Sequence, residues 1–315
     1  MVYAIIAAAI LAVLLLITYW CYRMAFYADR SIPQEEYPLP KGEAYEPYRD
    51  KMVQWIKETR QMPHEDVEIT SFDGLKLRGR FFEYAPNAPI ELMFHGYRGS
   101  SEQDLSGGVQ RCFKVGHSAL VVDQRACGRS EGNKITFGVL ESRDCHSWIR
   151  FAREHFGEHR KLILCGISMG AATVLMAAGK PLPPNVIGVL ADCGYTSPKE
   201  IICEVIRQMK LPPAICYPFV RLGARLFAGF DLEEDSPLEA AARCRVPVIL
   251  FHGEGDDFVP CNMSVRNYEA CSARKRLVTV PGAGHGLSFP VDQEYYLQTL
   301  REFFGPEASY SESVF

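Results

Sequence analysis

The sequence predicts an α/β fold: a mostly parallel central sheet with helices on both faces, an N-terminal β-hairpin and a small helical cap, preceded by one transmembrane helix. Three observations lead to this prediction. Short continuous apolar runs alternate with helical patterns from residue 90 onward, which is typical of parallel strands buried on both faces. Two runs of alternating polarity precede them, and an uncharged apolar stretch comes first in the chain.

The apolar stretch at residues 2–22 carries no charged side chain. About 20 helical residues cover ~30 Å, the hydrocarbon thickness of a bilayer. Tyr19, Trp20 and Tyr22 at its end resemble the aromatic belt of a membrane interface. A secretory signal peptide, the alternative, would need a basic start, a shorter apolar core and a small-residue cleavage site, and the segment has none of these. We therefore expect residues 2–22 to span a membrane.

Charges and cysteines favour a reducing compartment and no nucleic-acid partner. The net charge is −4 with both signs interspersed, so the sequence shows no basic patch. Its 11 cysteines include no C-x-x-C pair, and most lie in apolar runs, where free thiols act as small hydrophobic groups. Arg23 and Arg30 follow the apolar stretch while no Lys or Arg precedes it, so the positive-inside rule also predicts a cytoplasmic body.

Three segments are expected beyond the membrane helix: a proline-rich linker at 23–46, a folded domain at 47–308 and a tail at 309–315. The domain opens with a surface helix near residues 47–60. Two alternating runs on either side of Asp73-Gly74 then predict an antiparallel hairpin.

The parallel sheet is expected to take its strands from six apolar runs: residues 90–94, 119–123, 161–166, 186–192, 246–253 and 276–282. Helical patterns lie between them, most clearly at 138–156 and 169–178. Right-handed crossovers bring the carboxyl ends of such strands to one edge, where ligands bind in α/β sheets.

One connection is far longer than a crossover needs, because about fifty residues separate Asp192 from Val246. A helix at 197–210 is followed by a segment rich in proline and aromatic residues. We interpret residues 211–235 as a small cap over the active-site edge. An ordinary surface excursion is the alternative, and the apolar content of the segment favours the cap.

The segment Gly166-Ile167-Ser168-Met169-Gly170 matches the G-x-S-x-G pattern. It follows an apolar strand and leads directly into a helical run, which is the setting of a nucleophile elbow. A turn this tight needs small neighbours, and the two glycines meet that need. The backbone N–H of Met169, at the start of a helix, then faces the place where an oxyanion would form.

Five motifs occur in order: His95-Gly96-Tyr97-Arg98-Gly99, the segment from Asp123 to Gly132, the GISMG elbow, His252-Gly253 with Asp256 and Val259-Pro260, and Gly284-His285-Gly286. Together they resemble the α/β-hydrolase superfamily, in particular the serine aminopeptidase and BEM46-like hydrolases, over about residues 65–305. The resemblance implies an α/β-hydrolase fold and a Ser-His-Asp triad, and it does not specify a substrate.

A serine hydroxyl needs a base, and the base needs an acid that holds its tautomer. The acid and then the histidine follow the serine in this fold. His285 lies in a loop after the last strand and is the expected base, whereas His252, at the end of a strand, is expected to be structural. The family spacing selects Asp256 as the acid over its neighbour Asp257, and Asp192 is the fallback.

By resemblance, the amide of Tyr97 is the second oxyanion donor beside that of Met169. Removal of one such donor typically costs about 3–4 kcal/mol in the transition state. His95 is expected to be structural, and the Arg125 region is expected to support the loop that carries Tyr97.

No cofactor or metal is predicted. His155 and His159 match H-x-x-E-H, but a glycine ends the helix between them and a strand begins at Lys161, so they cannot share a helical face as a zinc site requires. The sequence contains no G-x-x-x-x-G-K-[ST] phosphate-binding loop.

These residues predict a membrane-anchored serine hydrolase that cleaves small-molecule or lipid-like carboxyl esters or thioesters. The same triad serves peptidases, so an aminopeptidase-like serine peptidase is the alternative, although the sequence locates no site for a charged peptide terminus. A non-catalytic, membrane-tethered scaffold is an alternative of another class. Such proteins usually lack the nucleophile or the histidine, and this chain has both.

Overall fold

The computed structural model describes residues 1–29 and 35–305. Arg30, part of the predicted linker and the predicted tail at 309–315 lie outside the described residues. One eight-stranded sheet runs through the body in the order β1-β2-β4-β3-β5-β6-β7-β8. Its strands are β1 (Glu65–Thr70), β2 (Lys76–Phe82), β3 (Ile90–Phe94), β4 (Ser118–Val122), β5 (Leu162–Ile167), β6 (Val186–Asp192), β7 (Val248–Gly253) and β8 (Lys275–Val280).

The sheet is mostly parallel, as predicted. β1 and β2 form the expected antiparallel hairpin, and β2 also runs antiparallel to β4. The remaining neighbours are parallel from β4 to β8. Each of the six predicted apolar runs coincides with a strand, and the observed bounds differ from the predicted ones by at most two residues. Strands β3 to β7 are almost entirely buried. Their continuous apolar sequences are those expected of parallel strands covered on both faces.

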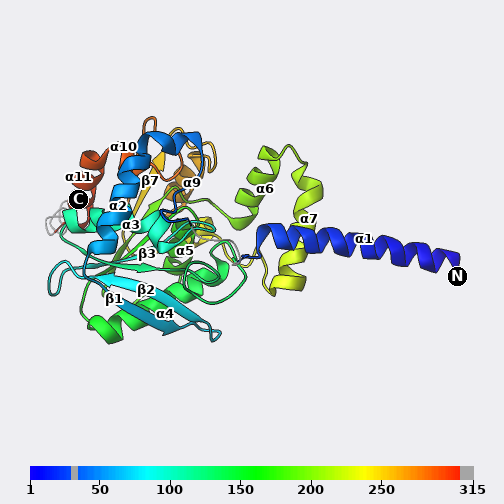
Figure 1. Cartoon of the computed structure of the whole chain (residues 1–315), viewed down its shortest axis with the longest axis horizontal. Helices are drawn as coiled ribbons and strands as arrows, with labels where there is room; N and C mark the ends of the chain where they lie inside the picture. Colours follow the sequence, from blue (N-terminus) through cyan, green and yellow to red (C-terminus); the bar gives the residue numbers. More distant parts are fainter. Residues whose placement is uncertain (30–34, 306–315) are drawn as a thin grey trace.

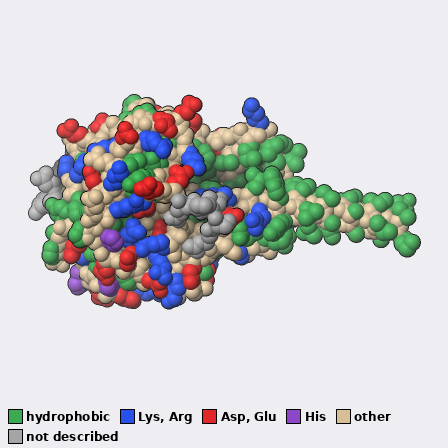
Figure 2. All heavy atoms as spheres, viewed as in Figure 1, with side chains coloured by type: hydrophobic (Ala, Val, Ile, Leu, Met, Phe, Trp, Pro, Cys, Tyr) green, Lys and Arg blue, Asp and Glu red, His purple; other side chains and the backbone are tan. Residues whose placement is uncertain are grey.

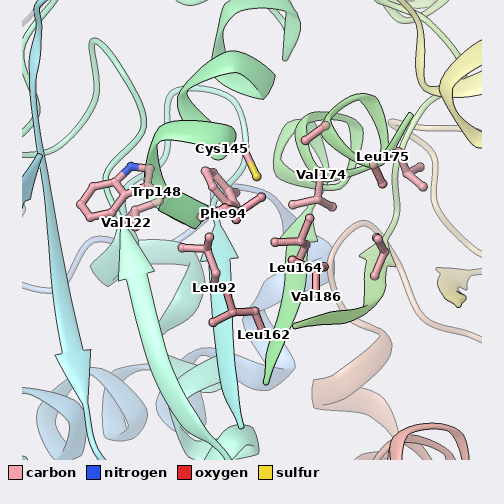
Figure 3. Close-up of a cluster of buried hydrophobic side chains, with 14 of the residues drawn as sticks. Leu92, Phe94, Val122, Cys145, Trp148, Leu162, Leu164, Val174, Leu175 and Val186 are labelled. Atoms are coloured by element: carbon pink, nitrogen blue, oxygen red, sulfur yellow. The ribbon is translucent and has the colours of Figure 1, made fainter. Parts of the chain in front are cut away.

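Helices cover both faces of the sheet (Figure 1). On one face α4 (Val139–Phe156) and α5 (Met169–Ala178) pack over the central strands. Figure 3 shows this core, in which Leu92 and Phe94 of β3 and Leu164 of β5 meet Trp148 of α4 and Val174 of α5. The opposite face is covered by α2 (Arg49–Gln61), α3 (Ser101–Lys114), α10 (Ser288–Val291) and α11 (Gln293–Phe304).

The remaining elements are the short helix η1 (Glu43–Tyr48), α6 (Pro198–Gln208), α7 (Pro213–Gly223), the single π turn η2 (Ala224–Ala228), α8 (Pro237–Arg243) and α9 (Asn262–Ala270). Of these, α8 packs against α5, and α9 packs against α8 and the strands β7 and β8. α6 and α7 project from the body at the carboxyl edge of the sheet (Figure 1). The predicted cap therefore corresponds to α7 and η2, and α6 before it belongs to the same projection.

The apolar N-terminal segment forms one long helix, α1 (Val2–Ala25), which extends three residues beyond the predicted span. It is long and apolar enough to cross a membrane once. Most of it projects from the body as an exposed apolar rod (Figures 1 and 2). Its last turns differ, because Thr18 and Tyr22 are buried against α7. A Cβ atom on Gly223 of α7 would lie 3.0 Å from the Thr18 carbonyl oxygen, so the two helices cross closely at a glycine.

Candidate active site

Ser168 occupies a strained turn between β5 and α5. Its backbone has φ 55° and ψ −115°, a conformation that non-glycine residues rarely adopt. The glycines on either side are required by close backbone approach. A Cβ on Gly166 would lie 2.1 Å from the carbonyl oxygen of Gly170, and a Cβ on Gly170 would lie 2.0 Å from that of Phe94. The strain directs the Ser168 side chain away from the sheet and toward the last loop.

Three predicted residues, distant in sequence, meet at this turn. The Oγ atom of Ser168 lies 2.9 Å from Nε2 of His285, and Nδ1 of His285 lies 2.7 Å from Oδ2 of Asp256. An ionised carboxylate only accepts hydrogen bonds, so the ring proton belongs on Nδ1. Nε2 is then free to accept the serine proton, which is the geometry of a nucleophile, a base and an orienting acid.

Asp256 is held as a buried carboxylate. Its Oδ1 accepts hydrogen bonds from the backbone N–H groups of Phe258 and Val259, at 3.0 and 2.8 Å. Nε2 of His252 lies 3.2 Å from Oδ2. Burial alone would raise the pKa of Asp256, but the hydrogen bonds with His252 and His285 outweigh it and hold the pKa well below its ordinary value. The carboxylate is therefore ionised whenever His285 works as a base.

The other acid candidates lie elsewhere. Asp192, the fallback, is buried at the end of β6, where it accepts hydrogen bonds from Ser288 Oγ at 3.0 Å and Tyr296 Oη at 3.1 Å. Asp257 is exposed. His252 is fully buried and touches Asp256 rather than Ser168, so its place is that of a supporting residue.

The loop after β3 carries Tyr97 and is braced from two sides. Buried His95 donates through Nδ1 to the Gly96 carbonyl at 2.7 Å and accepts through Nε2 from the Gln124 backbone N–H at 2.9 Å. The Gly96 N–H donates to Oδ2 of Asp104 at 2.8 Å. Across from this loop, Met169 is the first residue of α5, where backbone N–H groups lack partners within the helix. Of the two predicted oxyanion donors, Met169 directly follows Ser168, and Tyr97 lies on a separate loop that lines the same cavities as Ser168.

Comparison with known proteins agrees with this topology. The family model for the α/β hydrolase fold matches residues 92–231. An esterase from Pyrococcus furiosus superposes with a TM-score of 0.62 at 22% identity, covering 79% of this chain and 94% of that one. The chain has the α/β-hydrolase fold.

Two sequence relatives match part of this chain. A Bacillus subtilis protein named uncharacterized protein YqkD is 28% identical over 191 residues, which are 60% of this chain and 62% of that protein. A thiohydrolase from Aspergillus aculeatus is 31% identical over 125 residues, which are 39% of each chain. This chain therefore spans less than two thirds of the length of both relatives.

The Arg125 region contacts the Tyr97 loop through Gln124. The Gln124 Nε2 donates to the His95 carbonyl at 2.6 Å, and its backbone N–H donates to Nε2 of His95 at 2.9 Å. Arg125 itself has other partners: its guanidinium group forms two hydrogen bonds with buried Asp144 of α4, at 2.7 and 2.8 Å, and two with Asp73 of the β1–β2 turn. The motif located the supporting segment, and the residue beside the arginine makes the contact.

Two side chains of the Tyr97 loop form hydrogen bonds with the end of the apolar helix and the residues after it, and no sequence motif predicts these bonds. Tyr97 Oη donates to the carbonyl oxygen of Ala25 at 2.8 Å. Arg98 Nη2 donates to the carbonyls of Met24 and Tyr27, at 2.7 and 3.1 Å. The last carbonyls of a helix lack partners within it and carry partial negative charge, so a hydroxyl and a guanidinium group satisfy both needs.

Two cavities that differ in polarity meet at Ser168. An apolar cavity of about 320 Å³ lies between α1, α6, α7 and the Ser168 turn. A larger and more polar cavity, about 630 Å³, lies on the other side and is lined by residues 40–45, the Tyr97 loop and the loop of His285. Tyr97, Ser168 and Phe258 line both cavities. A substrate bound across Ser168 would therefore place one part in apolar surroundings and the other among polar groups.

Cys193 adjoins the triad, although it carries no motif in the sequence. It directly follows β6, and its sulfur lies within 4.8 Å of ligand atoms of Asp256 and His285. Burial raises the pKa of this thiol well above its ordinary value, so it stays neutral and fills space beside the acid and the base.

Proposed function

We propose that this protein is a membrane-anchored serine hydrolase that cleaves carboxyl esters or thioesters through an acyl-enzyme. The observation that carries the proposal is the continuous hydrogen-bonded chain from Ser168 through His285 to Asp256, at 2.9 and 2.7 Å. A serine on a strained turn, hydrogen-bonded to an imidazole that an acid orients, is the arrangement that acyl transfer needs.

The reaction proceeds in two halves. Ser168 Oγ bonds to the carbonyl carbon of the substrate as its proton moves to Nε2 of His285. The tetrahedral oxyanion accepts hydrogen bonds from the amides of Tyr97 and Met169. The same proton then passes to the departing alcohol or thiol, leaving an ester on Ser168. Water attacks that ester, His285 takes and returns its proton in the same way, and the carboxylic acid leaves.

Two features of the cavities support esters and thioesters over peptides. The cavity between α1 and α7 is almost entirely apolar, which suits an acyl chain. α1 is long and apolar enough to span a membrane, and an anchor beside an apolar cavity suits amphiphilic substrates.

We place the anchor at residues 2–22 and the hydrolase domain on the cytoplasmic side, since Arg23 follows the apolar segment.

One observation favours a second candidate, an aminopeptidase-like serine peptidase. The polar cavity includes the carboxyl groups of Glu43, Asp104 and Asp257, and carboxylates can bind a peptide's amino terminus. The polar cavity also contains Lys41, so it is not purely acidic.

A substrate panel tests these alternatives. The full-length protein in detergent micelles is assayed with p-nitrophenyl esters, acyl thioesters and aminoacyl anilides, alongside Ser168→Ala and the control Ser272→Ala, whose serine is exposed and bonded to backbone carbonyls. We expect esters and thioesters to be cleaved faster than anilides, with loss of about 10⁶-fold in Ser168→Ala and no change in Ser272→Ala. Faster anilide cleavage favours the peptidase. A folded wild-type protein that cleaves none of them favours the scaffold.

A further inference from the structure

The last turns of α1 form part of the apolar cavity next to Ser168. Trp20, Cys21, Met24 and Ala25 contribute one side of the cavity, and α6 and α7 contribute the opposite side. Ser168 and Met169 also line it. A helix that served only as a tether would not need to reach the nucleophile, so its position at this cavity calls for a functional explanation.

α1 is fixed in this position from two sides. Its close crossing with α7 occurs where Gly223 approaches Thr18 and Tyr22. Its carboxyl end is held by Tyr97 and Arg98, which donate to the carbonyls of Met24, Ala25 and Tyr27. The same loop carries the proposed oxyanion amide, so this side of the cavity is joined directly to the reaction centre.

The cavity also lies at the depth where a bilayer surface is expected. At 1.5 Å per residue, a hydrocarbon layer of about 30 Å takes up about 20 residues, so a span that starts near Val2 ends near Cys21. The residues of α1 that line the cavity, from Trp20 to Ala25, lie at this end of the span and just beyond it. The cavity would then stand at the level of the lipid head groups and the first part of their acyl chains.

The projecting helices around the cavity expose apolar side chains at the same end of the molecule. Soluble proteins rarely expose large contiguous apolar patches, and such patches mark contact with a partner or a membrane. Figure 2 shows apolar surface continuing from α1 onto this projection, whereas charged side chains cover the body. The exposed apolar residues of the projection are Met209, Leu211, Ile215, Leu222 and Leu226.

We propose that α1 is a wall of the acyl-binding site, and that the substrate is a single-chain acyl amphiphile drawn from the surrounding bilayer. Its acyl chain lies between α1 and α7, its ester or thioester carbonyl lies at Ser168, and its polar alcohol or thiol part lies in the polar cavity. This inference rests on the proposed hydrolase function and adds the substrate class and the role of the membrane helix.

The preference for acyl-chain length tests whether α1 is a wall of the acyl-binding site. The full-length protein is assayed with p-nitrophenyl esters from acetyl to decanoyl. Each methylene group buried in the cavity is expected to raise kcat/KM about fourfold until the cavity is full. Met24→Trp fills the cavity and is expected to lower the decanoyl-to-acetyl ratio at least tenfold. Met24→Ala enlarges it and is expected to move the optimum to longer chains. Leu16→Trp, which makes a similar change on an exposed part of α1 outside the cavity, is the matched control and should keep the wild-type ratio.

A second assay tests the origin of the substrate. The full-length protein is placed in phosphatidylcholine nanodiscs with 4-methylumbelliferyl palmitate either in the same discs or in separate vesicles. Turnover is expected to be at least tenfold faster when enzyme and ester share a bilayer. Equal turnover would overturn the bilayer route.

Failure of this inference can be told apart from failure of the proposed function. The role of α1 is overturned if kcat/KM does not depend on the acyl-chain length of the ester. It is also overturned if both Met24 variants keep the wild-type dependence on chain length. Either result leaves the proposed hydrolase function intact. Absence of turnover with every ester and every thioester in folded wild-type protein overturns the proposed function itself, and the inference with it.

Discussion

The hydroxyl group of Tyr97 donates a hydrogen bond of 2.8 Å to the carbonyl oxygen of Ala25. This contact joins the loop of the proposed oxyanion hole to the last turn of the apolar helix, 72 residues away in sequence. The ring of Tyr97 also stacks on Phe137, with centroids 5.0 Å apart. The side chain thus fixes the loop between the apolar helix α1 and the core of the domain, even though the proposed oxyanion donor is its backbone N–H.

Tyr97→Phe removes only this hydroxyl and tests the link. The Ala25 carbonyl loses a donor, which costs about 1–3 kcal/mol when the group stays buried. We expect kcat to fall severalfold because the loop is held less firmly, and unfolding in detergent to occur at lower denaturant concentration. Tyr84→Phe, on an exposed tyrosine, is the control and should match the wild type in both measurements. Identical kcat values for Tyr97→Phe and the wild type would show that the link does not position the loop.

Substitution of the adjacent aspartates separates the two acid candidates. Asp256→Asn should lower kcat by about 10⁴-fold, because an amide in that place no longer favours the His285 tautomer that accepts the serine proton. Asp257→Asn should lower kcat less than tenfold, since its side chain is exposed and outside the hydrogen-bonded chain. Steady-state ester hydrolysis measures both. If Asp257→Asn lowered kcat more than Asp256→Asn does, the acid would be Asp257 and not Asp256.

The nucleophile turn predicts a difference between two glycine substitutions. Gly170→Ala places a methyl group 2.0 Å from the Phe94 carbonyl oxygen, so backbone must move, and we expect loss of activity and a lower thermal midpoint. Gly108→Ala in α3 meets only the flexible Met93 side chain, with its sulfur at 3.1 Å, and should be tolerated. Circular dichroism melts and ester assays compare the two. A stable, active Gly170→Ala protein would show that the elbow is looser than described.

Acid stability is expected to depend on Glu91, which is buried in β3. Its carboxylate pairs with Arg111 and lies 2.9 Å from Nδ1 of His117. Burial alone would raise its pKa, but Arg111 and His117 outweigh burial and lower the pKa from 4.5 to about 2. Because the folded-state pKa is the lower one, the stabilising contribution is complete above about pH 4.5 and is lost as the pH falls toward 2.

Glu91→Gln should therefore flatten the dependence of unfolding free energy on pH between about 4.5 and 2. It should also reduce stability at neutral pH by about 3–5 kcal/mol, because Arg111 would stay buried without its counter-charge. Urea unfolding at a series of pH values measures both effects. The exposed control Glu154→Gln should keep the wild-type curve. If Glu91→Gln keeps that curve as well, the pair does not govern acid stability.

The strands and the order of the site residues could be predicted because each is encoded locally. β3 and β5 are continuous apolar runs because both strands are buried. The turn at Ser168 needs glycines two residues before and after it because the backbone approaches closely there. Each local sequence pattern therefore indicates the local structure. The motifs of the last two loops, with Asp256 and His285, follow in the order that the parallel sheet brings to one edge.

The contacts of α1 could not be predicted, because they depend on tertiary packing. Nothing in the sequence of residues 18–25 specifies that α7 crosses there at Gly223, or that Tyr97 and Arg98 reach its carboxyl end. For a related reason, the sequence could not show which side chain of the Arg125 region contacts the Tyr97 loop. The motif gives the position of the turn, but the direction of each side chain follows from the packing of α4 and the β1–β2 turn.

The central claim is that Ser168 is an activated nucleophile, and covalent labelling tests it most directly. Full-length protein is treated with a fluorophosphonate, digested and analysed by mass spectrometry. We predict one phosphonyl adduct, on the peptide that contains Ser168, and no adduct in Ser168→Ala. A folded wild-type protein that stays unlabelled, or that carries its adduct on another serine, would contradict the account.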